Sequence, residues 1–244
     1  MSQVKHHYDT LLADAYTWML GGFEARIAQS AALFERLNVT PGLTGRAIDI
    51  GCGTGFQTLP LLRRGFAVDA VDFSEQLSSQ LRSVAGAETG LRLHVLDAVE
   101  YLSGDQERVD LIVCMGDTLV HFESRAYLAR FLQLARARLH AFGIMVVTIR
   151  DYSQTLTGAD CVIPVRLSYH RMLTCVLAFT DESIFVTDLR YDRHPNGDWS
   201  AQKSTYQKLR ILPDQLNAAM HSAGFAIREA SIANGLVTLV AGVL

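Results

Sequence analysis

The stretch Asp49-Ile50-Gly51-Cys52-Gly53-Thr54-Gly55 carries the clearest chemical signal in the sequence. An acidic residue is followed by glycines at alternate positions, directly after the apolar run 47–50. Glycine has no β-carbon, so such a loop can pass closely beneath a nucleoside-bearing ligand. The dinucleotide pattern G-x-G-x-x-G/A does not fit, because Phe56 occupies its sixth position. A nicotinamide-dependent dehydrogenase is therefore the least favoured interpretation.

Two further acidic residues stand where later strands are expected to end. They are Asp72, followed by Phe73, and Asp97, followed by Ala98. A carboxylate after the second strand can accept both hydroxyls of a ribose, and one after the third can accept from an adenine amino group. Each acid could instead cap the following helix. The glycine loop and Asp72 at this spacing together favour a ligand.

The order of elements predicts the sheet that positions these residues. Apolar runs typical of strands alternate with helical segments, with Ser74 as a plausible N-cap. Such alternation predicts a doubly wound parallel sheet. The predicted strands are 47–50, 66–71, 91–96, 109–115 and 143–149, and the predicted helices are 58–64, 74–84 and 126–139.

The segments on either side of this core have different patterns. Residues 8–38 have helical periodicity, interrupted at Gly21-Gly22, which predicts an N-terminal helical lid. After Arg150, strand-like runs follow one another around a turn at His194–Asp198, which predicts an antiparallel β insertion. We expect this insertion to sit over the ligand end of the sheet and shape a substrate pocket.

A helix opened by Pro213 and two strands joined by Asn234-Gly235 end the sequence, as a hairpin at the sheet edge. We predict a single domain with four parts. They are a helical lid (1–40), a cofactor-binding α/β core (41–150), an antiparallel β substrate cap (151–212) and the end of the core (213–244).

Composition narrows the function classes. The 244 residues are 49% hydrophobic and 19% charged, with a net charge of −3. This excludes a disordered chain and disfavours nucleic-acid or membrane partners. The four cysteines show no metal-binding or paired spacing, and the N-terminal residues do not resemble a signal peptide, so we expect a cytoplasmic protein. A homodimer is left open.

The segments Ala47–Gly55, Asp72, Asp97-Ala98 and Val109–Met115 together resemble the class I S-adenosylmethionine-dependent methyltransferases. The resemblance implies a seven-stranded sheet of order 3-2-1-4-5-7-6 with the last strand antiparallel, and S-adenosyl-L-methionine as cofactor with S-adenosyl-L-homocysteine as product. The glycines would line the cofactor, Asp72 would hold its ribose and Asp97 would meet its adenine. The implied cofactor-binding residues are Tyr16, Trp18, Arg26, Asp49, Gly51, Cys52, Gly53, Gly55, Asp72, Phe73, Asp97, Ala98 and Met115.

A narrower resemblance is to the glycine N-methyltransferase branch. It is carried by Trp18–Gly21 with Arg26, by Met115–His121, by Gly143–Tyr152 and by Lys208–Pro213. It implies that a tryptophan and an arginine of the N-terminal arm cover the methionine part of the cofactor. Aromatic residues at helical spacing could equally belong to the core, and an arginine there could be an exposed helix charge.

The same resemblance assigns substrate binding to Arg150 and Tyr152, because a guanidinium at a strand end can clamp a carboxylate. Asp117 departs from this branch, which has asparagine there. A carboxylate near Arg150 would repel a small carboxylate substrate, which makes glycine itself doubtful. Asp117 could attract a cationic amine or accept a proton, and His121 could be the base or a structural histidine.

We therefore expect a methyltransferase that moves a methyl group by in-line displacement to a small molecule, at an amine or ring nitrogen. Alternatives are O-methylation of a phenol or carboxylate, and a non-catalytic S-adenosylmethionine-binding partner subunit. The sequence contains no G-x-S-x-G, H-E-x-x-H or clustered metal ligands, so neither a hydrolase nor a metal site is expected.

Overall fold

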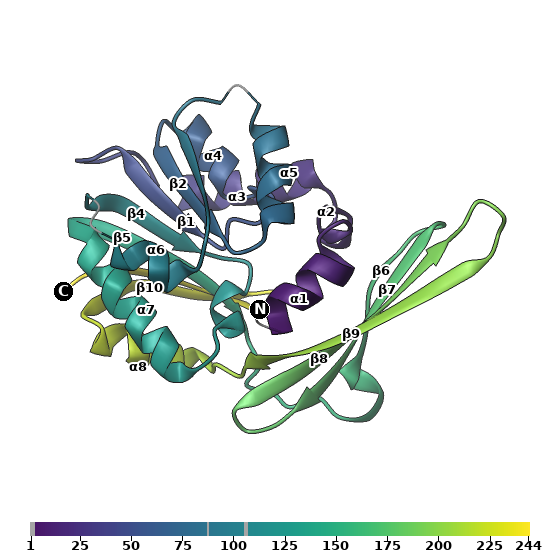
Figure 1. The fold of residues 1–244 in the computed structure, drawn as a ribbon. Coiled ribbons are helices and arrows are strands. Elements are labelled where there is room, and N and C mark those ends of the chain that lie inside the picture. Colours follow the sequence, from purple (N-terminus) through teal and green to yellow (C-terminus); the bar gives the residue numbers. More distant parts are fainter. Residues whose placement is uncertain (1–2, 87, 105–106) are drawn as a thin grey trace.

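A seven-stranded sheet forms the centre of the computed structural model, which describes residues 3–86, 88–104 and 107–244 (Figure 1). Its order is β3-β2-β1-β4-β5-β11-β10, and β11 runs antiparallel to β5. This confirms the predicted order and the antiparallel last strand. The strands are β1 Arg46–Ile50, β2 Ala67–Asp72, β3 Leu91–Val95, β4 Val109–Cys114, β5 Leu139–Arg150, β10 Phe225–Ala233 and β11 Leu236–Val243.

Helices cover both faces of this sheet (Figure 1). Alternate strand residues enter two separate cores: Ile48 and Ile112 face one, and Ala47 and Leu111 face the other. The inner strand β4 is therefore buried at every position, which explains its continuous apolar run. One face carries α3 Phe23–Arg36, α4 Thr58–Arg63 and α5 Glu75–Ala85, and the other carries α6 Ala98–Ser103, α7 Arg125–Arg138 and α8 Pro213–Ser222.

The N-terminal segment is helical but irregular. Helix α1 (Gln3–His7) continues into a π-helical turn, η1 (Tyr8–Leu12), and α2 (Tyr16–Met19) follows. Gly21 and Gly22 both have positive φ angles, 101° and 104°, and end this region before α3 begins. The predicted break at this glycine pair is confirmed.

The insertion forms a second sheet of order β6-β7-β8-β9, antiparallel throughout, which projects from the core (Figure 1). Its strands are β6 Val162–Leu167, β7 Arg171–Phe179, β8 Ser183–Arg193 and β9 Trp199–Leu209, after a short 3₁₀ turn η3 Gly158–Cys161. The predicted turn is present, because the His194 N–H donates to the Asp198 carbonyl at 2.8 Å. One face of the sheet packs on the N-terminal helices, where Val4 meets Leu177, Val186 and Tyr206.

Three elements differ from the sequence-based expectation. Helix α6 was not predicted, and it begins because the Asp97 side chain accepts from the N–H groups of Val99 and Glu100. Strand β5 starts earlier than expected, at Leu139, which pairs with Val109 before a register shift. The sequence pattern predicts a strand over 205–212 after the turn, but strand β9 starts earlier, since Trp199 already pairs with Arg193.

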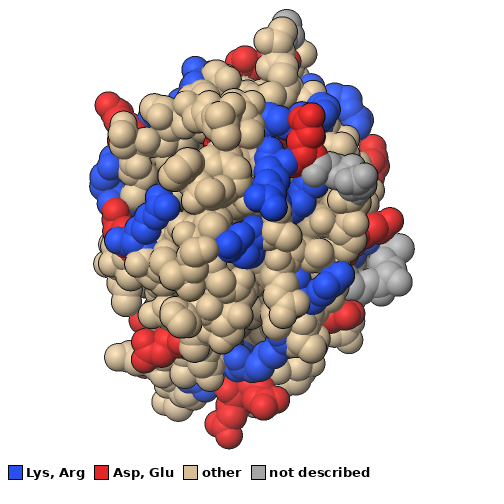
Figure 2. Space-filling view, turned by 90° about the vertical axis from the view of Figure 1, so that its left-hand side faces the viewer, with Lys and Arg blue, Asp and Glu red and all other residues tan. Residues whose placement is uncertain are grey.

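The structure also bears on the state of the cysteines, on membrane-spanning helices and on the distribution of surface charge. The four cysteines are free, and within the described residues no helix is both long and apolar enough to span a bilayer. The face in Figure 2 carries Lys and Arg side chains scattered among uncharged residues and near Asp and Glu.

Candidate functional site

A cavity of about 930 Å³, including its open mouth, lies at the carboxyl ends of β1 and β2. Its walls include Gly51, Gly53 and Asp72 from the core strands and Tyr8 and His121 from elsewhere. In open α/β sheets, this end of the strands is where ligands bind. Seven of the predicted cofactor positions line it, namely Tyr16, Gly51, Gly53, Asp72, Phe73, Asp97 and Ala98.

The glycine loop has a backbone that requires glycine. Gly51 and Gly53 have φ angles of 71° and 52°. A β-carbon at Gly51 would lie 2.5 Å from Thr118, and one at Gly53 would lie 3.5 Å from the Tyr16 ring. Gly55 plays another part, because its β-carbon would lie 2.4 Å from Leu81 in the core. At Gly51 and Gly53 the loop thus packs against side chains that also line the cavity, and at Gly55 it packs against the core.

Asp72 holds this loop in place. Its carboxylate accepts the Gly53 N–H at 2.9 Å and the Ser74 N–H at 2.8 Å. The residue is 7% exposed, and burial raises the pKa of Asp72 although both backbone bonds lower it. The carboxylate therefore sits between the loop and the cavity, with lone pairs left for hydroxyl donors.

Asp97 combines the two roles that the sequence left open. It caps α6, accepts the Tyr127 hydroxyl and also lines the cavity. Phe73 and Ala98 lie beside it in the cavity wall. The carboxylate is exposed, so it remains accessible to a polar group in the cavity.

Three predicted cofactor residues support the loop from below instead of lining the cavity: Asp49, Cys52 and Met115, all buried. Asp49 accepts the Thr58 hydroxyl at 2.6 Å. Burial raises the pKa of Asp49 to about 7, partly offset by this hydrogen bond. Its carboxyl thus joins the loop to the start of α4.

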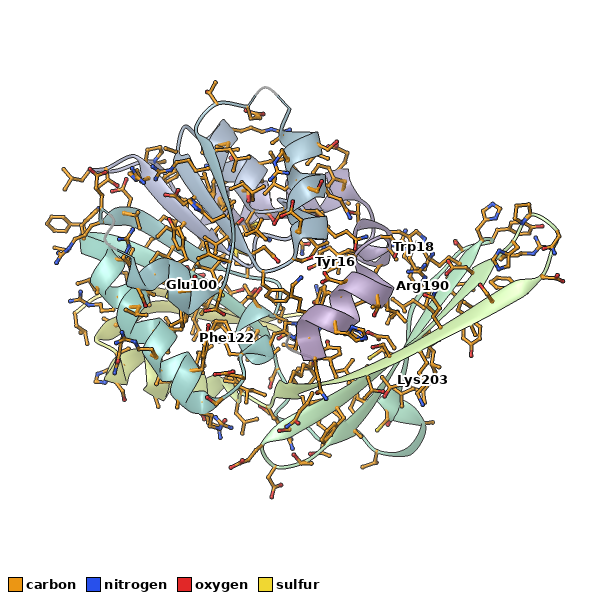
Figure 3. The ribbon with its side chains drawn as sticks, in the orientation of Figure 1. Tyr16, Trp18, Glu100, Phe122, Arg190 and Lys203 are labelled. Carbon is orange, nitrogen blue, oxygen red and sulfur yellow. The ribbon has the colours of Figure 1, made fainter. Side chains whose placement is uncertain are left out.

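Tyr8 and Tyr16 cover the cavity from the N-terminal side, as Figure 3 shows for Tyr16. The Tyr8 hydroxyl lies 3.4 Å from His121 Nε2. Burial, and then the nearby Lys208 charge, lower the pKa of His121 to about 4, so its imidazole is neutral at pH 7. Its Nδ1 is buried without a hydrogen-bond partner among the described residues. Tyr8 belongs to the lid expected from sequence but was not assigned to the site.

Trp18 and Arg26 are not brought to the cavity. The indole of Trp18 faces the insertion, where the guanidinium groups of Arg166 and Arg171 lie 5.9 and 5.6 Å from its ring (Figure 3). Arg26 is half-buried, does not line the cavity and donates to Gln29 on its own helix. The Trp18 ring, which the resemblance assigned to the cofactor, thus makes cation–π contacts with the insertion instead.

Asp117 is buried in an ion pair and does not line the cavity. Its Oδ2 accepts from Lys208 Nζ at 3.0 Å, and its Oδ1 accepts the Arg150 N–H at 2.8 Å. Lys208 also donates to the Tyr152 hydroxyl at 2.6 Å, while the Arg150 side chain is exposed beyond the strand end. The geometry therefore separates Asp117, Arg150 and Tyr152 from the cavity, whereas His121 lies in its wall.

The sequence analysis assigned no role to Lys208, which in the structure bonds both Asp117 and Tyr152. A signal for it was present, because an acid at Asp117 in an apolar neighbourhood requires a nearby cation. The insertion also differs from expectation: the described residues that line the cavity come from the N-terminal segment and the core. Instead of forming the wall, the insertion buttresses the helices that do.

Comparisons with known proteins agree with this arrangement. Residues 47–157 match a family described as methyltransferase domain. A glycine/sarcosine N-methyltransferase from Aphanothece halophytica is 30% identical over 112 residues, covering 46% of this chain and 42% of that protein. A magnesium-protoporphyrin O-methyltransferase from Rhodobacter capsulatus is 36% identical over 104 residues, covering 41% and 44%. The chain spans about half the length of such curated relatives or less.

Among solved structures, an amino pentose methyltransferase from Micromonospora echinaspora, with S-adenosylmethionine bound, is similar over 95% of this chain and 96% of its own. The TM-score is 0.75 at 18% sequence identity. This likeness shows a shared fold over nearly the whole chain. Within the described ranges, no three His, Cys, Asp or Glu side chains converge as metal ligands.

Proposed function

Because this chain belongs to the class I S-adenosylmethionine-dependent methyltransferase family, we propose that it methylates an amine nitrogen of a small molecule. The observation that carries the proposal is a single cavity with two unlike walls. The glycine loop with Asp72 forms one wall, and the Tyr8–His121 pair forms the other.

The first wall fits S-adenosylmethionine. Gly51 and Gly53 leave backbone room at the cavity surface, and Asp72 and Asp97 offer carboxylate oxygens to hydroxyl and amino donors. When bound, this cofactor supplies a methyl group already activated by a positively charged sulfur. The protein therefore has to align the acceptor and exclude water.

The second wall suits an amine. Because the pKa of His121 is lowered to about 4, its imidazole stays neutral and accepts hydrogen bonds through the physiological pH range. The Tyr8 oxygen beside it is a second acceptor. An amine N–H that donates to either group keeps its nitrogen lone pair free for attack. Tyr16 and Phe122 complete the apolar cover and keep water out.

The test measures binding and turnover separately. S-adenosylhomocysteine should bind, and if calorimetry finds no binding tighter than about 1 mM the proposal fails. His121→Gln should lower kcat at least about 10-fold on an accepted amine, with affinity for S-adenosylhomocysteine unchanged. Tyr8→Phe should show a smaller loss. An unchanged kcat in His121→Gln would remove this residue from the acceptor site.

O-methylation is the second candidate, since one relative of 36% identity is named an O-methyltransferase. A panel of amines, phenols and carboxylates with deuterated methyl donor, followed by mass spectrometry, distinguishes the two. Label found on oxygen would replace the amine assignment. A chain that binds the cofactor product but labels no compound would instead fit a non-catalytic partner subunit.

A further inference from the structure

The four-stranded sheet has two faces, and the N-terminal helices pack on one of them. Its inner face packs on the N-terminal helices through Leu173, Leu177 and Tyr206. Side chains alternate along each strand, and the pairing aligns Thr187 with Val176 and Thr205 on the opposite side. The Thr187 and Thr205 hydroxyls lie 2.9 Å apart there, which confirms that this row shares one face.

We name this opposite side the outer face. By the registers of β6 to β9, it comprises Val162, Pro164, Leu167, Met172, Thr174, Val176, Ala178, Phe185, Thr187, Leu189, Tyr191, Arg193, Trp199, Ala201, Lys203, Thr205 and Gln207. In Figure 1, helices α1 and α2 lie on the other side of the sheet.

The outer face is unusually poor in charge. Its charged members are Arg193, at the far end over the Tyr169 ring, and Lys203, on the edge strand β9. Large apolar side chains stand exposed elsewhere on this face, with Leu167 74% and Val162 50% exposed on β6 and Phe185 40% exposed on β8. The face in Figure 2, by contrast, has charges of both signs scattered across it. A contiguous apolar surface of this kind marks an interaction site.

The size of the outer face suits a stable dimer. The four strands are 6, 9, 11 and 11 residues long, which at about 3.4 Å per residue and about 4.8 Å between strands gives a face of roughly 600 Å². A standard interface buries roughly 800 Å² on each partner. The sheet is thus large enough to supply most of one side of such an interface.

We propose that the outer face packs on the outer face of a second copy of this chain, forming a two-fold symmetric sandwich of two sheets. An apolar face meets itself across a two-fold axis without like-charge repulsion, and homodimer interfaces are the more apolar class. Its charges lie at the rim, where they stay hydrated. A charged partner would need complementary charges that the centre of this face does not provide.

Two features of the edge strand β6 favour face-to-face packing over edge-to-edge packing on that side of the sheet. It contains Pro164, which has no N–H to donate to a new strand, and a register shift follows this residue. Both features protect a sheet edge against pairing. This inference is independent of the proposed reaction, since the cavity lies on the core side of the lid.

The experiment measures solution mass by light scattering and sedimentation between about 1 and about 100 μM. The wild-type chain should have twice its 26.9 kDa monomer mass. Leu167→Glu and Phe185→Glu should each shift it to the monomer mass, because a buried unpaired carboxylate is costly. Both residues are exposed in the monomer, so both variants should fold.

The matched control is Phe142→Glu, which adds the same charge at a phenylalanine that is 80% exposed and lies in the seven-stranded sheet, away from the outer face. It should leave the dimer intact. Circular dichroism and S-adenosylhomocysteine binding confirm folding in every variant and report separately on the cofactor site. A wild-type monomer at about 100 μM, or a dimer that survives both outer-face variants, would overturn the proposal.

Discussion

The two walls of the cavity differ in how far apart in sequence their residues lie. The loop wall comes from one stretch, 49–98, in which Asp72 is bonded to nearby backbone N–H groups. The lid wall joins Tyr8 to His121, more than a hundred residues away. Behind it, His7 bonds Asp188 at 2.9 Å, and both are buried. One wall is therefore set by local chain geometry and the other by long-range packing.

Their electrostatics differ in the same way. In the loop wall, Asp72 and Asp97 each accept two backbone N–H groups, which are present once the chain has folded locally, and Asp97 also accepts the Tyr127 hydroxyl. The region behind the lid wall contains buried side-chain pairs such as the Lys208–Asp117 ion pair. Removing one member of such a pair leaves the other as a buried charge without a counter-charge. We expect the lid side to be the more vulnerable to single substitutions.

Lys208→Met is the strongest test of that difference. It leaves the buried Asp117 carboxylate without its cation, and the free energy of unfolding should fall by about 3–5 kcal/mol. Urea denaturation measures the loss. The double variant with Asp117→Asn should recover part of it, because no buried charge remains. Equal losses in the single and double variants would show that the ion pair is not what stabilises this region.

The corresponding test on the loop side uses pH. The pKa of Asp49 is raised by burial to about 7 in the folded chain, above its unfolded value of about 3.9. The folded state therefore holds the proton more tightly, and this contribution to stability is complete below pH 4 and lost as pH rises to 7. In the wild-type chain, the free energy of unfolding should therefore fall by about 2–4 kcal/mol between pH 4 and pH 7 because of Asp49. Asp49→Asn, which can still accept the Thr58 hydroxyl, should lack this fall. Parallel stability curves for the two proteins between pH 4 and 8 would contradict this.

The variant Gly51→Val tests whether the loop wall binds the cofactor, with affinity for S-adenosylhomocysteine as the measurement. Its β-carbon would lie 2.5 Å from Thr118, so affinity for S-adenosylhomocysteine should fall about 100-fold. Gly158→Val is the matched control, since Gly158 also has positive φ but no atom within 4 Å of its β-carbon. A similar loss of affinity in both variants would point to general backbone strain.

Arg26→Ala should have the smallest effect. Arg26 is half-buried, and among the described residues its side chain donates a hydrogen bond to Gln29 of its own helix. Because it does not line the cavity, affinity for S-adenosylhomocysteine should change less than about threefold. Calorimetry of this variant beside Arg36→Ala, on the same helix, provides the comparison. A loss above about 10-fold in Arg26→Ala alone would mean that the lid rearranges and brings this guanidinium to the cofactor.

The same contrast explains what the sequence could predict. The strand order, the glycine loop and the acids at strand ends follow from local patterns, and the structure brings Gly51, Gly53 and Asp72 together at one cavity. Gly55 and Asp49 were grouped with them because sequence spacing does not distinguish a residue facing the ligand from one beneath it. Whether Asp97 caps a helix or meets a ligand could not be decided for the same reason.

Predictions for the lid side depended on contacts that sequence does not encode locally. Trp18 was assigned to the cofactor because its segment resembles a known arm, but Arg166 and Arg171 of the insertion attract its ring. Asp117 was expected to act on substrate, and its ion pair with Lys208 forms only because β9 packs beside the turn Thr118–His121 that follows Asp117. These assignments require three-dimensional packing between segments far apart in the chain.

Hydrogen bonds hold the N-terminal segment to both the core and the insertion on either side of Tyr8. Asp9 accepts from Ser74 of the core at 3.1 Å, while His7 and the Leu11 carbonyl bond Asp188 and Arg190 of the insertion. Tyr8, between these fastenings, belongs to the cavity wall. A displacement of Tyr8 from the cavity wall would have to break these three hydrogen bonds together. The N-terminal segment therefore couples the insertion mechanically to the cavity, although none of the described residues that line the cavity belongs to the insertion.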